Sequence, residues 1–233
     1  MREVVDGVFE LSLGFVNVHL VVTDEGVVLV DTGLPRNSKK IDRALREIEK
    51  TIGDVRVVLL THHHFDHIGN VADIRRRSGA KVIAHAADAP VITGAITAEP
   101  PKGLARFAVR LIGTPEPTKL DQLITADGSS PVPGFTALHT PGHTRGHVSY
   151  LLERDGGVLF VGDTGGLRDG RIVLGPTQVS ADPAEQGRSL AKLAGYDFEH
   201  AVFGHGGAVK GRAVERFRAY AGSRSDGDAE GRS

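Results

Sequence analysis

Short apolar runs that alternate with helical patterns constrain the fold of this chain more than any other feature. The runs have the composition of strands buried on both faces. They cover residues 27–30, 55–60, 81–84, 157–161 and 201–203. Between them, apolar side chains recur at helical spacing over residues 41–48 and 68–79, and Gly79 is placed to end the second helix. The alternation predicts an α/β protein.

Two further segments refine this prediction. Asp182 precedes Pro183 and stands three residues before Glu185, the pattern of a capped helix start, and Gly195 is the expected stop. Near the N-terminus, strands are expected around residues 8–21 and 26–31, joined by a turn and not by a crossover helix. An antiparallel pair beside parallel strands predicts a mixed sheet.

The length of 233 residues favours one domain, which we place at residues 1–221. Residues 89–120 read as a proline-bracketed helical insert, which could form a lid over a substrate, pack on the core or make a dimer contact. Residues 222–233 lack apolar side chains to bury and are expected to be disordered.

Charge and cysteine content limit the partners. Lys and Arg number 28 against 29 Asp and Glu, so no overall field attracts nucleic acid or a membrane, and a small-molecule substrate is expected. The chain has no cysteine, so any metal must be bound by His, Asp or Glu. Acidic residues near the N-terminus do not suit a secretory signal, which favours a soluble, cytoplasmic protein. A homodimer is left open.

The stretch THHHFDH at residues 61–67 carries a dense set of metal-ligand side chains. His62 and His64 follow the strand predicted at 55–60 and, two residues apart in extended chain, point to the same side. Asp66 and His67 lie at the turn into the next helix. This arrangement offers ligands to two metal sites.

Further candidate ligands stand at equivalent places along the chain. His143 follows the run GFTALH and its TPG turn, Asp163 follows GVLFVG, and His205 follows AVFG. Loops at the carboxyl ends of strands converge at one edge of an α/β sheet, so these side chains could meet those of the THHHFDH loop.

The motifs THHHFDH, TPGHTRGH, GDT and FGHG, in this order, resemble those of the metallo-β-lactamase superfamily of binuclear metallohydrolases. The resemblance implies an αββα sandwich of two mixed sheets with helices on the outer faces. It assigns His62, His64 and His143 to a first metal. It assigns Asp66, His67 and His205 to a second metal, with Asp163 bridging both.

Two divalent ions of this kind, with zinc expected and iron or manganese also compatible with the ligands, share a water and raise its acidity. The expected enzyme is a hydrolase in which a metal-bridging hydroxide attacks an ester-like bond. Asp66 is the candidate catalytic residue, because it could orient this water or shuttle its proton.

Other polar residues near the motifs could have supporting or structural roles. Asp31 could accept a ring N–H from a ligating histidine or could cap a turn with Gly33. His147 is expected in packing or in support of a ligand, and His63 is expected to point away from the metals.

The choice of substrate is limited by the positions at which this sequence differs from individual subfamilies. Thiolate-dependent β-lactamases are excluded by the missing cysteine, and lactonases resemble this chain but carry a tyrosine where Thr164 and the following glycines stand. Only 28 residues follow His205, which disfavours a true glyoxalase II. We expect cleavage of a thioester or lactone, with a mononuclear iron persulfide dioxygenase or a β-lactam hydrolase as alternatives.

Overall fold

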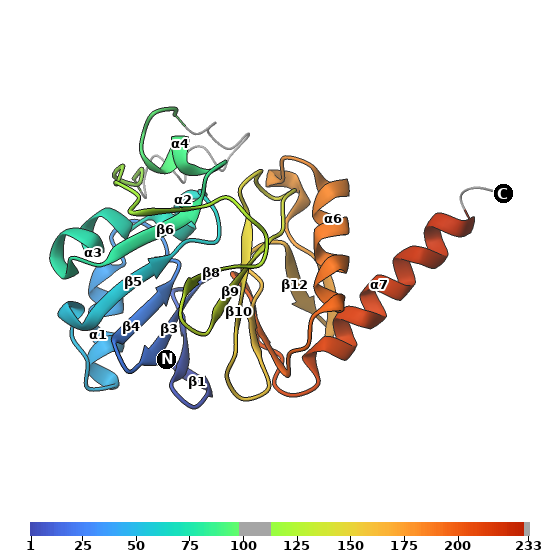
Figure 1. Cartoon of the computed structure of the whole chain (residues 1–233), viewed down its shortest axis with the longest axis horizontal. Helices are drawn as coiled ribbons and strands as arrows, with labels where there is room; N and C mark the ends of the chain where they lie inside the picture. Colours follow the sequence, from blue (N-terminus) through green and yellow to red (C-terminus); the bar gives the residue numbers. More distant parts are fainter. Residues whose placement is uncertain (98–112, 231–233) are drawn as a thin grey trace. The chain divides into compact units, whose positions relative to one another are not determined.

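The computed structural model describes residues 1–97 and 113–230. It contains two compact units, Met1–Asp127 and Gly128–Ser233 (Figure 1). The helical part of the insert predicted at 89–120 lies mostly outside the described residues, apart from the short helix α4 (Ala89–Ile92). Within the described residues, no helix has the length and apolar character needed to cross a membrane.

The first unit contains a seven-stranded sheet whose strands lie in sequence order. Its strands are β1 (Arg2–Val5), β2 (Val8–Ser12), β3 (Asn17–Thr23), β4 (Gly26–Val30), β5 (Val55–Leu59), β6 (Lys81–His85) and β7 (Gln122–Ile124). Strands β1 to β4 pair antiparallel, whereas β4 to β7 pair parallel. The predicted mixed sheet is therefore confirmed.

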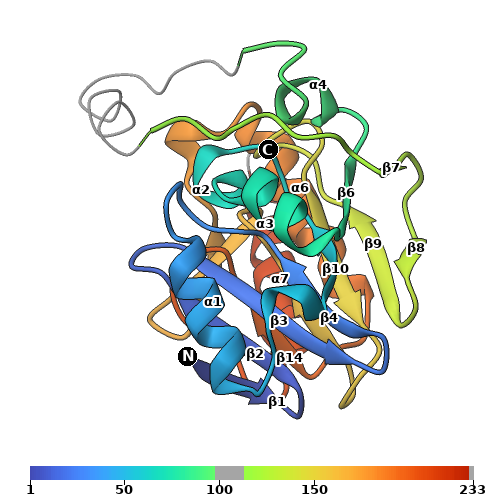
Figure 2. The same ribbon diagram turned by 90° about the vertical axis from the view of Figure 1, so that its left-hand side faces the viewer.

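Helices α1 (Ser38–Glu47) and α3 (Val71–Ser78) lie on one face of this sheet (Figure 2). Their apolar side chains, including Ile41, Leu45 and Ile74, join the strand residues in one buried core. Gly79 adopts a left-handed conformation at the C-terminus of α3, as expected for a helix stop. A short 3₁₀ helix, η1 (Ile52–Asp54), precedes β5.

The helix predicted over 68–79 is two helices, α2 (Phe65–Ile68) and α3. Gly69 separates them and lies directly against the backbone of residues 33–35, where a Cβ atom would come within 2.2 Å of the Pro35 nitrogen. Only glycine allows this approach, so a distant segment of chain sets the break.

The second unit contains a five-stranded sheet with the order β14, β11, β10, β9, β8. The strands are β8 (Ser129–Val132), β9 (Phe135–His139), β10 (Val148–Leu152), β11 (Val158–Phe160) and β14 (His200–Val202). Only β11 and β14 pair in parallel. Strands β12 (Gly165–Arg168) and β13 (Arg171–Leu174) form a separate antiparallel pair.

Helices α6 (Pro183–Lys192) and α7 (Ala213–Glu230) cover the core of the second unit, with 3₁₀ turns η2 (Thr177–Val179) and η3 (Leu193–Gly195) beside α6. Asp182 caps α6 by accepting the Glu185 N–H at 2.9 Å, as the sequence predicts.

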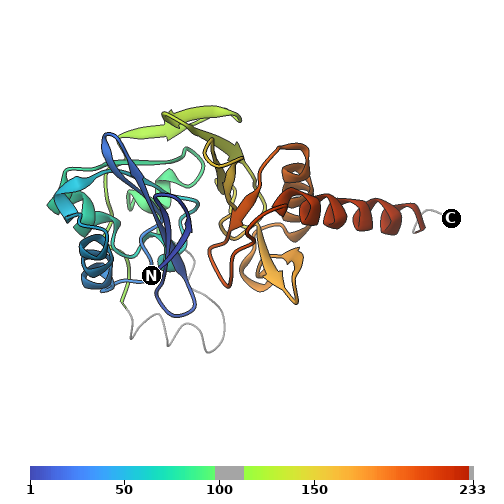
Figure 3. The same ribbon diagram turned by 90° about the horizontal axis from the view of Figure 1, so that it is seen from below.

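Figure 3 shows α7, in red, as one continuous helix. It extends over residues 222–230, where disorder was expected. Ala213, Val214 and Phe217 anchor its start in the core, and a helix that is already nucleated propagates more easily than a new one forms. The single domain over 1–221 stays a prediction.

Candidate metal centre

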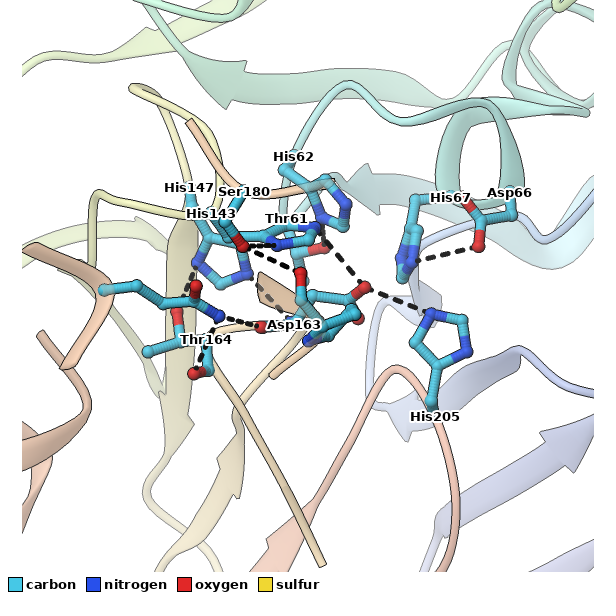
Figure 4. Close-up of polar contacts among 12 residues, drawn as sticks. Thr61, His62, Asp66, His67, His143, His147, Asp163, Thr164, Ser180 and His205 are labelled. Atoms are coloured by element: carbon cyan, nitrogen blue, oxygen red, sulfur yellow. Dashed lines mark hydrogen bonds and ion pairs between the residues drawn. The ribbon is translucent and has the colours of Figure 1, made fainter. Parts of the chain in front are cut away.

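The THHHFDH loop leaves the carboxyl end of β5 and brings its candidate ligands together within the first unit. The ring centroids of His62 and His64 are 4.6 Å apart, and those of His62 and His67 are 4.1 Å apart. An Asp66 Oδ2 atom lies 3.8 Å from His67 Nε2. His62, Asp66 and His67 are buried, and Figure 4 shows their side chains.

Asp31 fixes the orientation of His67 from the neighbouring strand. It follows β4, has a φ of 63° and is buried, and its Oδ2 lies 2.8 Å from His67 Nδ1. A carboxylate in this position accepts the Nδ1–H and leaves Nε2 as the atom that can bind a cation. This geometry agrees with the first of the two readings of Asp31.

Thr61 connects the same carboxylate to His62. Its hydroxyl donates to Asp31 Oδ2 at 2.7 Å and so accepts from His62 Nδ1 at 3.0 Å, while its backbone N–H donates to Asp31 Oδ1. The donor roles follow from the partners, because a carboxylate only accepts. His62 therefore also presents Nε2.

The backbone around His67 is held by Thr32 and Asn70. The N–H and hydroxyl of Thr32 donate to the His67 carbonyl at 2.7 and 2.9 Å. Asn70 donates to the carbonyls of Thr32 and Leu34 and accepts from the backbone of Asn37 and Ser38. The roles of Thr61, Thr32 and Asn70 were not predicted from the sequence, although Thr61 is the first residue of the THHHFDH stretch.

His63 contacts a different carboxylate from its neighbours. Its backbone N–H donates to Asp88 Oδ2 at 3.0 Å, and its Nδ1 lies 3.0 Å from the same oxygen. Asp88 is buried at the residue before α4. The side chain of His63 thus takes part in anchoring the loop to the segment that precedes the insert.

In the second unit, the parallel pairing of β11 with β14 places Asp163 beside His205. Phe160 pairs with Val202, and Asp163 and His205 each lie three residues further along. Asp163 Oδ2 is 3.0 Å from His205 Nε2 and 3.5 Å from His143 Nε2 (Figure 4). Asp163 and His143 are buried, whereas the side chain of His205 is 29% exposed.

His143 is oriented in the same manner as the histidines of the first unit. The Ser180 hydroxyl donates to the Pro176 carbonyl at 2.8 Å and lies 3.1 Å from His143 Nδ1, from which it can accept. The Nε2 atom faces Asp163. No sequence signal singled out Ser180, which lies 37 residues from its partner.

His147 is fully buried and contacts the backbone of Asp163. Its Nε2 lies 3.0 Å from the Asp163 backbone nitrogen, which donates to it. Its Nδ1 lies 2.9 Å from the hydroxyls of Thr140 and Thr164. With both ring nitrogens in such bonds, His147 has no nitrogen to offer to a cation.

The donor set of each unit suits divalent cations. The first unit offers imidazole Nε2 atoms of His62 and His67, the His64 ring and the Asp66 carboxylate, and the second offers His143, His205 and Asp163. Zinc, iron and manganese accept such nitrogen and oxygen ligands. The buried rings with engaged Nδ1 atoms are what a metal site needs, since outer partners fix the ligand orientation.

A comparison with protein families matches residues 11–205 to the model described as the metallo-β-lactamase superfamily. The match begins in β2 and ends at His205, so it includes all the candidate ligands.

Two proteins of similar sequence differ in how much of their own length this chain matches. The "Probable metallo-hydrolase YflN" of Bacillus subtilis is 28% identical over 90% of this chain and 88% of its own length. The hydroxyacylglutathione hydrolase of Maricaulis maris is 33% identical over 70% of this chain and 52% of its own length. This chain thus spans about half of that hydrolase.

Among solved structures, BJP-1, a subclass B3 metallo-β-lactamase of Bradyrhizobium japonicum, aligns with a TM-score of 0.74. The alignment covers 98% of this chain and 92% of BJP-1 at 21% identity. This likeness shows the fold, and it confirms the fold class that the sequence motifs implied.

Proposed function

Because the chain belongs to the metallo-β-lactamase superfamily, we propose that it is a hydrolase that uses two divalent cations to cleave an ester-like bond of a small molecule. The family match over residues 11–205 includes all seven candidate ligands, and this supports one binuclear centre.

In this proposal, each cation takes three ligands and the two cations share a carboxylate. His62, His64 and His143 would hold the first, and each of them offers one ligand nitrogen. Asp66, His67 and His205 would hold the second. Asp163 would be shared, since its carboxylate already contacts a histidine from each set, His143 and His205.

The observation that carries the proposal is that three histidines are oriented by the same kind of hydrogen bond. His62, His67 and His143 each have Nδ1 bound to an oxygen of the protein, which leaves Nε2 as the ligand atom. Three histidines that served only in packing would not all need the same fixed tautomer.

Bound divalent cations would supply an activated water and a Lewis acid for the carbonyl oxygen. The chain's own contribution is orientation and proton handling. Asp66 is 7% exposed and adjoins His67, so it is the carboxylate that we propose to orient the water or pass its proton to the leaving group. Asp31, Thr61 and Ser180 keep the imidazoles in position during the reaction.

For the substrate, we propose a thioester or a lactone. The match to a hydroxyacylglutathione hydrolase supports ester-like chemistry, although it covers about half of that protein. The likeness to BJP-1 concerns the fold alone. Thioester and lactone share an acyl carbonyl with a good leaving group, and the proposal concerns that shared chemistry.

The test is metal analysis of the purified protein followed by a panel of thioesters, lactones, β-lactams and phosphodiesters, with and without a chelator. We expect two divalent metal ions per chain and chelator-sensitive cleavage of the first two substrate classes. One iron per chain with persulfide oxidation, or cleavage of β-lactams alone, would contradict the proposal.

A pair of variants separates the ligand role from general damage. Asp163→Ala removes the shared carboxylate and should lower metal content and reduce kcat/KM by roughly a thousandfold, about 4 kcal/mol. His63→Ala removes a neighbouring imidazole, but the backbone bond from residue 63 to Asp88 remains, so activity should stay near wild type. Equal loss in both variants would count against the assignment.

A further inference from the structure

We propose that His147 and Gln186 are positioning residues that hold the backbone of Asp163 from both sides. The proposal rests on the proposed function, in which Asp163 is the shared metal ligand. Both side chains are fully buried, and neither belongs to the proposed ligand set. His147 contacts the N–H of Asp163, and Gln186 contacts its carbonyl.

The contact from His147 requires one tautomer. Nε2 accepts the Asp163 N–H at 3.0 Å and therefore carries no proton. The proton is on Nδ1, and the hydroxyls of Thr140 and Thr164, each 2.9 Å away, share this one donor. Because Thr164 in turn donates to the Thr140 carbonyl at 3.3 Å, the imidazole is fixed in orientation as well as in protonation.

The contact from Gln186 comes from helix α6. Its Nε2 donates to the Asp163 carbonyl at 2.9 Å and to the Thr164 carbonyl at 3.2 Å. Both bonds require the amide nitrogen to face the carbonyls, so the orientation of the amide is determined by its partners. A glutamine in the first turn of α6 is thus directed at the peptide that follows β11.

Two glycines make this close arrangement sterically feasible. A Cβ atom on Gly142 would lie 2.1 Å from the Gln186 nitrogen. One on Gly175 would lie 1.9 Å from the Asp163 carbonyl oxygen and 2.8 Å from Gln186 Nε2. Side chains at either position would displace the glutamine or the aspartate backbone.

With its N–H and carbonyl both fixed, Asp163 retains freedom only in its side-chain torsions. The fixed backbone limits where these torsions can carry the ligand oxygen, which lies 3.0 and 3.5 Å from the Nε2 atoms of His205 and His143. Metal sites need ligands held within about 0.5 Å of the working geometry, and partners of the ligands supply that precision. If His147 and Gln186 only needed hydrogen-bond partners for their buried polar atoms, both would not have to contact the backbone of the same residue, Asp163.

The experiment compares variants that remove or retain these contacts. His147→Leu and Gln186→Met remove the acceptor and the donor at similar size, whereas His147→Gln retains an amide oxygen that can accept from Asp163. Leu193→Ala is the matched control, because Leu193 is fully buried just after α6 and its truncation destabilises the unit while both hydrogen bonds to the Asp163 backbone remain.

The metal-free protein of each variant is titrated with Zn²⁺ in competition with a chelator, with Co²⁺ absorption as a second readout and the melting temperature of the metal-free form as a stability measure. We expect His147→Leu and Gln186→Met to lose roughly ten- to a hundredfold in Zn²⁺ affinity and to alter the Co²⁺ spectrum. His147→Gln should retain most of the wild-type Zn²⁺ affinity and a Co²⁺ spectrum close to that of the wild type. Leu193→Ala should lower the melting temperature with little change in either metal readout.

Unchanged Zn²⁺ affinity in His147→Leu and Gln186→Met would overturn the positioning role, as would an equal loss of affinity in Leu193→Ala. If the wild-type chain binds two Zn²⁺ ions while these variants behave like it, only the positioning role fails. If the wild-type chain itself binds no metal, the proposed function fails and the positioning role fails with it.

Discussion

Asp31 accepts a hydrogen bond from Nδ1 of His67 across 2.8 Å, and both side chains are buried. The same carboxylate oxygen accepts from the Thr61 hydroxyl, which contacts His62. One carboxylate therefore orients two histidines that we assign to different metals.

Replacing Asp31 with Asn should weaken both proposed sites. The amide offers one acceptor oxygen where the carboxylate offers two, so the bonds to His67 and Thr61 cannot all be retained. We expect a loss of roughly ten- to a hundredfold in Zn²⁺ affinity, measured by chelator competition. Asp24→Asn on the exposed β3–β4 turn is the control. Affinity within twofold of wild type in Asp31→Asn would contradict the role.

Thr61→Val tests the relay to His62 with almost no change in shape. The substitution removes the hydroxyl that donates to Asp31 and accepts from His62. The buried carboxylate and imidazole each lose a partner, at a cost of about 1–3 kcal/mol. We expect lower thermal stability and weaker metal binding. Thr23→Val, whose hydroxyl donates only to the Gly26 carbonyl in a turn, should bind metal normally.

Gly69→Ala should disrupt the junction between α2 and α3. The added Cβ would lie 2.2 Å from the Pro35 nitrogen and 2.4 Å from the Gly33 carbonyl oxygen, and backbone atoms cannot give way as a flexible side chain can. We expect destabilisation of about 3 kcal/mol in urea unfolding. Gly195→Ala, whose Cβ would have no atom within 4 Å beyond its own local backbone and chain neighbours, should change stability by no more than about 0.5 kcal/mol. Similar results for both would refute the steric explanation.

The Asp121 carboxylate should contribute stability that depends on pH. The Arg75 guanidinium, bonded to it at 2.9 and 3.2 Å, lowers the pKa of Asp121; burial opposes this shift, and the Val82 N–H assists it. Since the folded pKa lies below the unfolded value of about 3.9, the stabilisation is present above that value and is lost as pH falls through the folded pKa.

Urea unfolding of wild type and Asp121→Asn should therefore show a stability difference at pH 6 that narrows below about pH 4. Glu116→Gln, on an exposed ion pair with Arg76, should show little difference at either pH. A difference for Asp121→Asn that stays constant down to pH 2 would contradict the linkage.

Hydrophobic periodicity and capping residues were sufficient to predict the helices and strands that depend on a few neighbouring residues. The apolar runs became β4, β5, β6, β11 and β14, Asp182 caps α6, and Gly79 ends α3. The candidate ligands all follow strand ends, as expected. These features depend on periodicity and capping, which one stretch of sequence contains in full.

Features that depend on distant partners could not be predicted in this way. The strand expected over 8–21 is broken into β2 and β3 where the Leu13 N–H bonds to the Val16 carbonyl. The contacts of Asn70 with residues 32–38, and of Gln186 with Asp163, join positions more than twenty residues apart. A single sequence holds no local sign of such pairings.

The parallel register of β11 and β14 constrains how this protein can change. Inserting or deleting one residue between Phe160 and Asp163 would shift the aspartate relative to His205, even with every proposed ligand still present. The lengths of the two short loops are thus tied to each other. Descendants or engineered versions that retain a metal should vary in composition at these loops, and vary in length elsewhere, as in the β12–β13 turn.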